Sequence, residues 1–268
     1  MMSKTVLITG ASSGIGAATA QYFVRQGWNV SATMRSPQQA GDWTKVENVI
    51  CPYLDLTLPE TIDNAVSETV ERFGRIDVLV NNAGYALMGP IEGVTIGQLE
   101  HQFQTNFFGL VSTIQAVLPI FRQQRSGTIV NVASIGGRLA FPLASSYHAT
   151  KWAVEGLSEA MRYELERFNI QVRIIEPGGI RTNFIDRGTE WASHPNYADL
   201  VERVKQFSER LNDSLPAPDG VAKTIYRAAT DRSDRLRYAP HGRVYLLIHA
   251  LLPDRLWRSL ISRSMLIK

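Results

Sequence analysis

Cysteine is nearly absent from this chain of 268 residues, whose one thiol is Cys51. A single cysteine excludes an internal disulfide framework, suits a reducing compartment and leaves no set of thiolates for zinc. The five histidines are scattered without the short spacing that metal ligands show. We therefore expect no metal site.

Long apolar runs are missing as well. The longest, VYLLIHALL at residues 244–252, is about half of the ~20 residues that a membrane-spanning helix needs. The apolar run in MMSKTVLITGASSG at the N-terminus is too short for a signal peptide, and glycines interrupt it. We therefore expect a cytoplasmic protein.

A strong net charge is the third missing feature. The formal net charge is only +3, so no nucleic-acid partner is expected. The positive charge is nevertheless concentrated at one end, because residues 227–268 hold eight Arg and one Lys against three Asp. Together with Trp257 and several leucines, this basic tail could touch an anionic membrane surface. We favour the alternative of a solvated helix face packed on the domain.

Apolar strand patterns alternate with helix patterns along most of the chain. The strand patterns cover residues 4–10, 28–35, 47–57, 76–84, 127–134 and 170–178. The helix patterns cover residues 16–27, 59–74, 95–124, 145–166 and 218–230. Continuously apolar strands that are each followed by a helix predict a parallel sheet covered on both faces. We expect the helix over 95–124 to bend between Asn106 and Gly109.

The chain shows no linker or change of composition, so we expect one α/β domain over residues 1–268. Two segments differ from the repeating pattern. Residues 185–218 are polar and aromatic, which predicts an excursion from the repeating pattern and not a unit of the sheet. Residues 235–242 suggest a last edge strand, and residues 240–268 a C-terminal extension.

The first chemical motif is TGASSGIG at residues 9–16, between a strand and a helix. Its glycines allow a tight turn, and the start of the helix offers unpaired N–H groups and a positive dipole to a pyrophosphate. Three residues separate Gly10 from Gly14, so the spacing differs from the G-x-G-x-x-G fingerprint. We expect a dinucleotide here, and a purely structural turn is the alternative.

The end of the second strand pattern indicates which dinucleotide is bound. A NAD-binding fold usually carries an acidic residue there, which accepts hydrogen bonds from the ribose 2′-OH. This chain has Thr33, Met34 and Arg35 instead. An arginine cannot accept those bonds, but it suits the dianionic 2′-phosphate of NADP. NADP(H) is therefore favoured over NAD(H), and the alternative is that Arg35 is an exposed bystander.

Polar residues follow three further strand patterns. Asp55 could accept a hydrogen bond from an adenine amino group, or it could equally cap a helix. The small residues of NNAG at residues 81–84 let a flat ring lie against the backbone, while the asparagine amides brace neighbouring strands. Ser134 places a hydroxyl at the mouth of the fifth strand.

Tyr147 and Lys151 are four residues apart in a helix pattern, so both side chains can reach one cavity. A phenol with a pKa near 10 is a poor base at neutral pH. A nearby ammonium, helped by a cationic nicotinamide ring, stabilises the phenolate and lowers that pKa. Ser134 can then hold the oxygen of a substrate while Tyr147 moves the proton.

With these motifs the chain resembles the short-chain dehydrogenase/reductase family. TGASSGIG, NNAG, Asn106, Ser134, YHATK and PGGIRT occur in the order of that family and at about its distances, over residues 4–182. The resemblance implies a single-domain Rossmann fold with a doubly wound, seven-stranded parallel sheet. It also implies a catalytic tetrad of Asn106, Ser134, Tyr147 and Lys151.

The resemblance further implies roles for these residues. Tyr147 would be the acid or base, Ser134 would polarise the carbonyl, and Lys151 would bind the nicotinamide ribose. Asn106 would bend its helix and hold a water of a proton relay. The implied cofactor-binding residues are Gly10, Ser12, Ser13, Gly14, Ile15, Gly16, Arg35, Asp55, Leu56, Asn82, Ala83, Gly84, Tyr147, Lys151, Pro177, Gly178, Ile180 and Thr182.

The style of the sequence also resembles the branch with 17β-hydroxysteroid and retinol dehydrogenases. We therefore expect an NADP(H)-dependent oxidoreductase that interconverts a ketone or aldehyde and an alcohol, on a bulky apolar substrate. One alternative is a non-catalytic NADP-binding redox sensor or scaffold, and another is an epimerase or dehydratase on the same fold. The resemblance also implies a homodimer or homotetramer formed through long helices.

Overall fold

The computed structural model describes residues 3–182, 184, 188–212 and 214–265, with the side chain of Asn212 omitted. The start of the expected excursion, at residues 185–187, lies outside the described residues. So do residue 213 and the last three residues of the expected C-terminal extension.

A parallel sheet of seven strands forms the centre of the molecule, in the order β3-β2-β1-β4-β6-β7-β9. Its strands are β1 (Thr5–Thr9), β2 (Asn29–Thr33), β3 (Val49–Ile50), β4 (Val78–Asn81), β6 (Gly127–Val132), β7 (Ile170–Ile175) and β9 (Arg237–Tyr238). The strands are buried almost throughout, as the continuous apolar patterns require. The predicted doubly wound α/β fold is confirmed.

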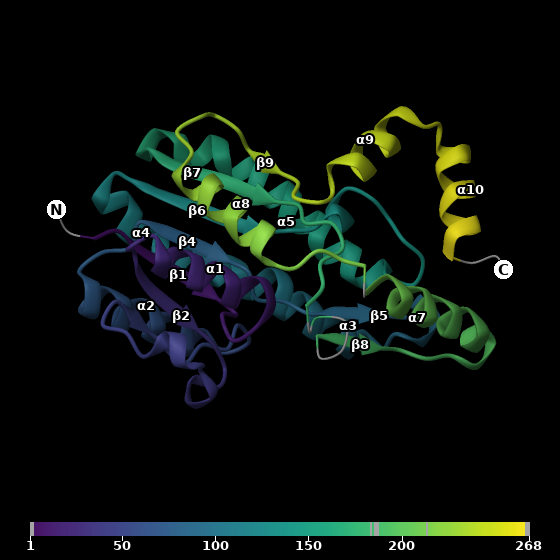
Figure 1. Ribbon diagram of the computed structural model, residues 1–268, viewed down its shortest axis with the longest axis horizontal. Helices are drawn as coiled ribbons and strands as arrows, with labels where there is room; N and C mark the ends of the chain where they lie inside the picture. The colour runs from purple at the N-terminus through teal and green to yellow at the C-terminus, as the bar shows by residue number, and fades with distance from the viewer. Residues whose placement is uncertain (1–2, 183, 185–187, 213, 266–268) are drawn as a thin grey trace.

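Helices cover both faces of this sheet, and Figure 1 shows α1 and α8 in front of it. Val6 and Ile8 of β1 pack in a core with residues of α1 and α8. Leu7, between them, faces a second core with residues of α2, α4 and α5. The helices are α1 (Gly14–Arg25), α2 (Pro59–Phe73), α3 (Ile96–Phe103), α4 (Gly109–Gln124), α5 (Ser145–Leu165), α7 (Ala198–Asn212), α8 (Asp219–Thr230), α9 (Arg243–Leu251) and α10 (Asp254–Met265).

The predicted break in the helix over 95–124 is confirmed. A π-helical segment, Gln104–Phe108, separates α3 from α4 and contains Asn106. The third strand, in contrast, is much shorter than the predicted 47–57. Only Val49 and Ile50 pair with β2 as a strand, and beyond Pro52, which has no N–H to donate, the pairing is reduced to one bridge between Met34 and Tyr53.

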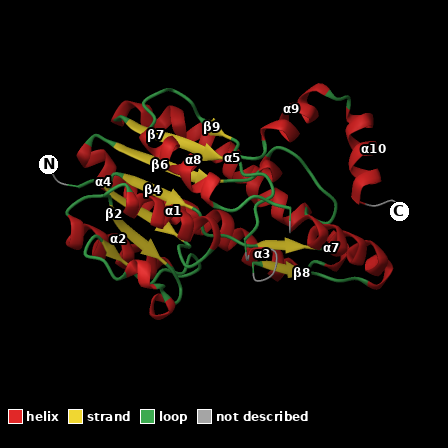
Figure 2. Ribbon diagram, in the orientation of Figure 1, coloured by secondary structure: helices red, strands yellow, loops and turns green. Residues whose placement is uncertain are grey.

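The excursion after β7 is more ordered than the sequence indicates. Thr189–Trp191 forms β8, which pairs in parallel with β5 (Ala86–Met88) outside the central sheet. Figure 2 shows this small sheet beside the main one, next to α7. The sequence analysis missed the helix α7, although Val201 and Val204 are buried and Leu200 and Phe207 lie partly buried at helical spacing from them.

The chain ends in α9 and α10, which project from the body of the molecule in Figure 1. The expected edge strand before them is short, because only Arg237 and Tyr238 pair with β7. In the described part of the chain, no helix is both long and apolar enough to cross a membrane.

Candidate active site

The glycine-rich turn after β1 is held by close backbone contacts. Gly10 has φ +69°, and a Cβ there would lie 2.8 Å from Cα of Ala83. A Cβ at Gly16 would lie 2.2 Å from the carbonyl oxygen of Gly10. Both positions therefore exclude larger residues. The turn leads into α1, whose first turn contains no acidic residue, so the positive end of the helix dipole is not compensated there.

The NNAG segment is tied to this turn by hydrogen bonds. The side-chain amide of Asn82 donates to the carbonyl oxygens of Thr9 (2.9 Å) and Gly10 (3.1 Å). The hydroxyl of Thr9 accepts from the backbone N–H groups of Asn82 and Ala83. Asn81 donates to Asn131 on the neighbouring strand, at 2.9 Å. The predicted bracing of strands by the asparagine amides is thus present in the structure.

Arg35 and Asp55 lie at the same edge of the sheet. Thr33 and Met34 are buried, whereas Arg35 is exposed directly after β2. Burial raises the pKa of Asp55, but hydrogen bonds from Thr57 and the charge of Arg35 outweigh it and lower that pKa overall. One carboxylate oxygen of Asp55 accepts from both the N–H and the hydroxyl of Thr57. Asp55 thus orders its own turn, and the N-cap of α2 is Leu58.

Asn106 is buried, and its π-helical segment turns the side chain toward the end of β4. Its amide donates to the carbonyl oxygen of Tyr85 (2.8 Å) and to the hydroxyl of Thr150 (3.1 Å). Its own oxygen accepts from the N–H of Tyr85, at 3.0 Å. Asn106 therefore links the NNAG strand end to α5, which carries the tyrosine and the lysine.

Ser134 lies near Tyr147, close enough for its hydroxyl to lower the pKa of the phenol against the effect of burial. Ser134 follows β6 and accepts from the N–H of Gly136 at 3.0 Å, while Tyr147 lies in the first turn of α5. Lys151 is buried one turn later, and its ammonium donates to the carbonyl oxygen of Val132 at 2.9 Å. The ammonium lies 5.8 Å from the centre of the Tyr147 ring. The predicted tetrad therefore comes together in space.

The electrostatics of this pair differ from the sequence analysis in one respect. Burial raises the pKa of Tyr147 to about 12, although the nearby hydroxyl of Ser134 opposes the shift. Burial also lowers the pKa of Lys151 to about 8, against the attraction of Glu155. We expected Lys151 to lower the pKa of the phenol. Without a bound cofactor, desolvation of Tyr147 raises this pKa by more than its neighbours lower it.

The segment after β7 runs beside both the turn and the C-terminal extension. A Cβ at Gly178 would lie 2.4 Å from the carbonyl oxygen of His241, so this glycine allows the extension to approach. Ile180 is buried in the core, and Pro177 accepts from the N–H of Ile135. Thr182 returns to the glycine-rich turn, since a Cβ at Gly14 would touch its side chain at 3.4 Å.

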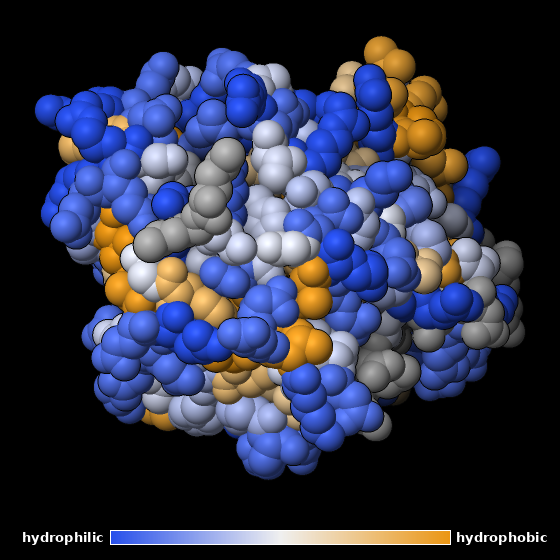
Figure 3. Space-filling model, turned by 60° about the vertical axis from the view of Figure 1, so that its left-hand side comes forward, coloured by the Kyte–Doolittle hydropathy of each residue, from blue (hydrophilic) through white to orange (hydrophobic). Residues whose placement is uncertain are grey.

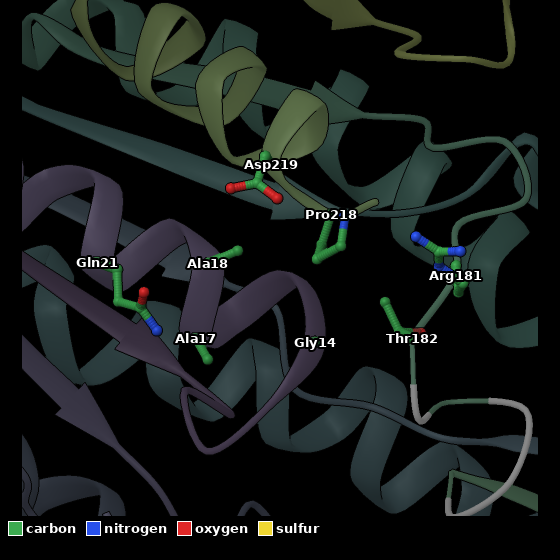
Figure 4. Close-up of a pocket in the computed structure, with 8 residues that line it drawn as sticks. All are labelled: Gly14, Ala17, Ala18, Gln21, Arg181, Thr182, Pro218 and Asp219. Atoms are coloured by element: carbon green, nitrogen blue, oxygen red, sulfur yellow. The ribbon is translucent and has the colours of Figure 1, made fainter. Parts of the chain in front are cut away.

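A cavity of about 360 Å³ opens at this contact, between the start of α1 and the start of α8 (Figure 4). Gly14 and Thr182, two predicted cofactor residues, lie on its wall beside Pro218 and Asp219. None of the four tetrad residues lines it. The cavity therefore marks the outer side of the glycine-rich turn and not the place of the chemistry.

His148 is a residue that the sequence analysis missed. Its Nδ1 lies 2.7 Å from the carbonyl oxygen of Gly136, and its Nε2 accepts from the N–H of Phe141 at 2.9 Å. These partners require the neutral tautomer with the proton on Nδ1. The ring therefore clamps the loop that follows Ser134 onto α5. Its position next to Tyr147 in the sequence was the available signal.

A buried carboxylate pair behind Lys151 was missed as well. Glu155, four residues after Lys151, accepts from Arg237 of β9 at 3.0 Å. Glu176 accepts from Arg138 at 3.1 Å. Burial and then the charge of Glu176 raise the pKa of Glu155 to about 7, with Arg237 opposing them. This network joins α5, β9 and the end of β7 below the catalytic residues.

Three kinds of comparison place the chain among known proteins. The family model described as "short chain dehydrogenase" matches residues 4–193. A 3-ketodihydrosphingosine reductase from Bacteroides thetaiotaomicron is 41% identical over 215 residues, or 80% of this chain and 76% of the relative. An oxidoreductase from Schizosaccharomyces pombe is 41% identical over 206 residues, or 76% of this chain and 87% of the relative.

A solved structure shows the same fold over nearly the full length. It is a short-chain dehydrogenase from Streptomyces avermitilis, with a TM-score of 0.84 and 35% identity over 96% of this chain and 94% of its own. Similar solved structures include complexes with NADP and with NAD. Given the matched model, these relatives and the assembled tetrad, the chain belongs to the short-chain dehydrogenase/reductase family of NAD(P)-binding oxidoreductases.

Proposed function

We propose that this protein is an NADP(H)-dependent carbonyl reductase, able to oxidise the corresponding alcohol in reverse. The observation that carries the proposal is the placement of Ser134 and Tyr147 near each other, with the ammonium of the buried Lys151 5.8 Å from the centre of the Tyr147 ring. A carbonyl oxygen that approaches this pair can accept a hydrogen bond from Ser134 and a proton from Tyr147. The whole chain would act as one catalytic domain, with the segment over residues 185–218 as the substrate lid.

The residues around the glycine-rich turn suit a dinucleotide. The crowding at Gly10 and Gly16 brings the backbone close to the start of α1, where N–H groups can bind a pyrophosphate. Gly84 keeps the ribose side open, since a Cβ there would lie 3.0 Å from the side-chain oxygen of Asn106. Bound NADPH would supply the hydride that is added to the carbonyl carbon.

The pKa of Tyr147 supports the direction of reduction. With a pKa of about 12 the phenol is protonated at neutral pH, so it is ready to donate. An alkoxide, formed as the hydride arrives at the carbonyl carbon, is a stronger base than a phenolate, and proton transfer to it is downhill. Lys151 would hold the ribose and provide a positive charge near the phenolate that remains.

The preference for NADP(H) rests on the end of β2. Met34 is buried and offers no carboxylate to a ribose 2′-OH, and the exposed guanidinium of Arg35 follows it. The guanidinium of Arg35 lies close enough to Asp55 to lower the pKa of that carboxyl. Arg35 is therefore near the edge of the sheet where we expect the adenosine. A 2′-phosphate would therefore meet Arg35.

A bulky apolar carbonyl compound is the proposed substrate class. Phe184 places its ring 6.2 Å from that of Tyr147, so the approach to the proton donor is partly aromatic. One relative is named for a long-chain amino ketone, 3-ketodihydrosphingosine, which is consistent with this class. We propose a long-chain ketone ahead of a steroid or a retinoid.

The test is turnover of a ketone panel with NADPH as the reductant. The panel should contain a long-chain 3-ketone, a steroid ketone, retinal and a short-chain ketone as a size control. We expect NADPH oxidation with the first and little with the short ketone. Tight NADPH binding without turnover of any member would instead support the redox sensor or scaffold. Conversion of a substrate without net NADPH consumption would indicate an epimerase or dehydratase.

We further propose that the protein is a homo-oligomer that assembles through α4 and α5, as members of the family commonly do. Large apolar side chains are exposed on and next to these elements. They are Phe108, directly before α4, and Trp152 and Tyr163 on α5, and the Tyr163 side chain is 73% exposed. Pairing of these surfaces between two copies would remove them from water. The expected cytoplasmic location stays a prediction.

A further inference from the structure

The C-terminal helix α9 exposes an apolar stripe along its outer side. Val244, Leu247, Ile248 and Leu251 follow the spacing i, i+3, i+4, i+7 of one helix face, and they are 65%, 52%, 38% and 82% exposed. Leu256 and Leu260 of α10 are one helical turn apart and are also exposed. Figure 3 shows a hydrophobic cluster at the upper corner of the molecule, where α9 meets α10.

These side chains are exposed even though the two helices pack against the domain. Trp257 is buried with Ile135 and Leu139 of the loop after β6. The partly buried side chains packed against this small core are Phe141, Leu246, Leu252 and Ile261. The pair of helices is therefore anchored through one face, while a second apolar face is left in water.

The charges around the bare stripe are almost all positive. Four exposed arginines lie on the same two helices, namely Arg243 of α9 and Arg255, Arg258 and Arg263 of α10. Among the described residues 240–265, Asp254 is the only acidic residue. Its carboxylate oxygen lies 4.0 Å from a guanidinium nitrogen of Arg258. Exposed apolar side chains together with exposed arginines on one pair of helices match the composition of helices that lie in the surface of an anionic bilayer.

We propose that α9 and α10 dock on an anionic lipid surface. The leucine and valine side chains would enter the boundary of the acyl chains, and the arginines would meet the lipid phosphates. A second copy of the chain fits this face less well. A two-fold contact would place the arginines of both copies against each other, with only Asp254 on each side to offset them.

The docked orientation has a consequence for the active site. The helices rest on Ile135 and Leu139, and this loop begins at Ser134, so their seat on the domain adjoins the loop that carries Ser134. A substrate that resides in a bilayer could then enter without crossing water. The docking itself does not depend on the proposed carbonyl reductase activity, because vesicle binding and turnover are measured separately.

The experiment is sedimentation of the full-length protein with vesicles of phosphatidylcholine, with or without phosphatidylglycerol. We expect binding only when phosphatidylglycerol is present, and a decrease with added salt. Leu247→Ser with Leu251→Ser should weaken the partition coefficient about tenfold for each leucine. Arg255→Gln with Arg258→Gln should weaken it about fivefold for each arginine.

Control variants carry changes of the same kind elsewhere on the surface. Val46→Ser alters an exposed apolar residue before β3, at the edge of the sheet opposite β9. Arg122→Gln with Lys223→Gln removes two exposed charges from α4 and α8. Both controls should bind vesicles like the wild type. The proposal is overturned if the wild type stays in solution with anionic vesicles, or if the leucine and arginine variants bind as it does. It is also overturned if the leucine variant only breaks an oligomer apart, since the face then covers a second copy.

Discussion

Tyr147 combines a desolvated phenol, the hydroxyl of Ser134 near it and a neighbouring ammonium. Tyr147→Phe removes only the hydroxyl, so the fold and the glycine-rich turn should stay intact. We expect kcat to fall by about 10²–10⁴-fold, the usual contribution of a general acid. NADPH binding, followed by fluorescence, should change little. An undiminished kcat would remove Tyr147 from the mechanism.

Lys151 is destabilising in the protein alone at neutral pH. Its folded pKa of about 8 lies below the ordinary 10.5, chiefly through burial, so the folded state binds fewer protons than the unfolded state between these values. Stability should therefore rise with pH over this range. The cost at neutral pH is about 3 kcal/mol, partly offset by about 1 kcal/mol from the hydrogen bond to Val132.

Lys151→Met should accordingly be inactive yet more stable than the wild type, by about 1–2 kcal/mol at neutral pH. Urea unfolding near neutral pH and again near pH 10 measures the difference. The advantage of the variant should shrink at the higher pH, where the wild-type lysine has lost its proton. A constant difference would show that burial of the charge is not the cause.

Arg35 decides the coenzyme under the proposal above. Arg35→Asp replaces a donor with an acceptor for the ribose 2′-OH, and we expect the ratio of kcat/KM for NADPH over NADH to fall by about 10-fold or more. Arg25→Asp, an exposed change at the end of α1, is the matched control. A ratio that does not move in Arg35→Asp would assign the preference to other residues.

At the scale of an element, the loop after β6 depends on His148. The ring accepts from Phe141 only while Nε2 carries no proton. Burial lowers the pKa of His148, against the hydrogen bond to Gly136, so the unfolded state binds the proton more tightly. This contribution to stability is present above pH 6.5 and is lost as the pH falls through the folded pKa.

His148→Gln should lose about 1–2 kcal/mol at neutral pH, because one of two hydrogen bonds disappears. In mild acid the wild type and the variant should converge. The measurement is the difference in Tm between wild type and variant across the acidic range. Glu155, whose raised pKa changes stability with pH in the opposite direction, is present in both proteins, so its effect cancels in this difference. Curves that stay parallel would contradict the clamp.

At the scale of the whole molecule, the proposed oligomer can be tested through the exposed face of α5. Trp152→Glu with Tyr163→Glu would place charges on the exposed face of α5, and we expect the proposed oligomer to dissociate to a monomer. Light scattering coupled to gel filtration gives the mass. Ile96→Glu, an exposed apolar position on α3, is the control and should leave the mass unchanged.

Much of the site could be predicted from local sequence. Gly10, Asn82 and Ser134 each follow a strand, and in a parallel sheet these ends meet at one edge, while Lys151 follows Tyr147 by one turn near the start of α5. The helix α7 was missed because its segment was predicted as an irregular excursion, although Leu200, Val201 and Val204 follow helical spacing. The link between Glu155 and Arg237 was equally hidden, since 82 residues separate the two partners.

The sequence by itself determined the fold class, the order of the chemical residues and the break at Asn106, because these depend on periodicity and spacing along the chain. Only the tertiary structure decided the rest. The pKa of Tyr147 rises and that of Lys151 falls because desolvation sums over neighbours from distant segments. For the same reason the basic tail could not be assigned beforehand. Whether Leu247 and Leu251 face water or the domain depends on the side of α9 that meets Ile135 and Leu139, and the structure leaves both leucines outside.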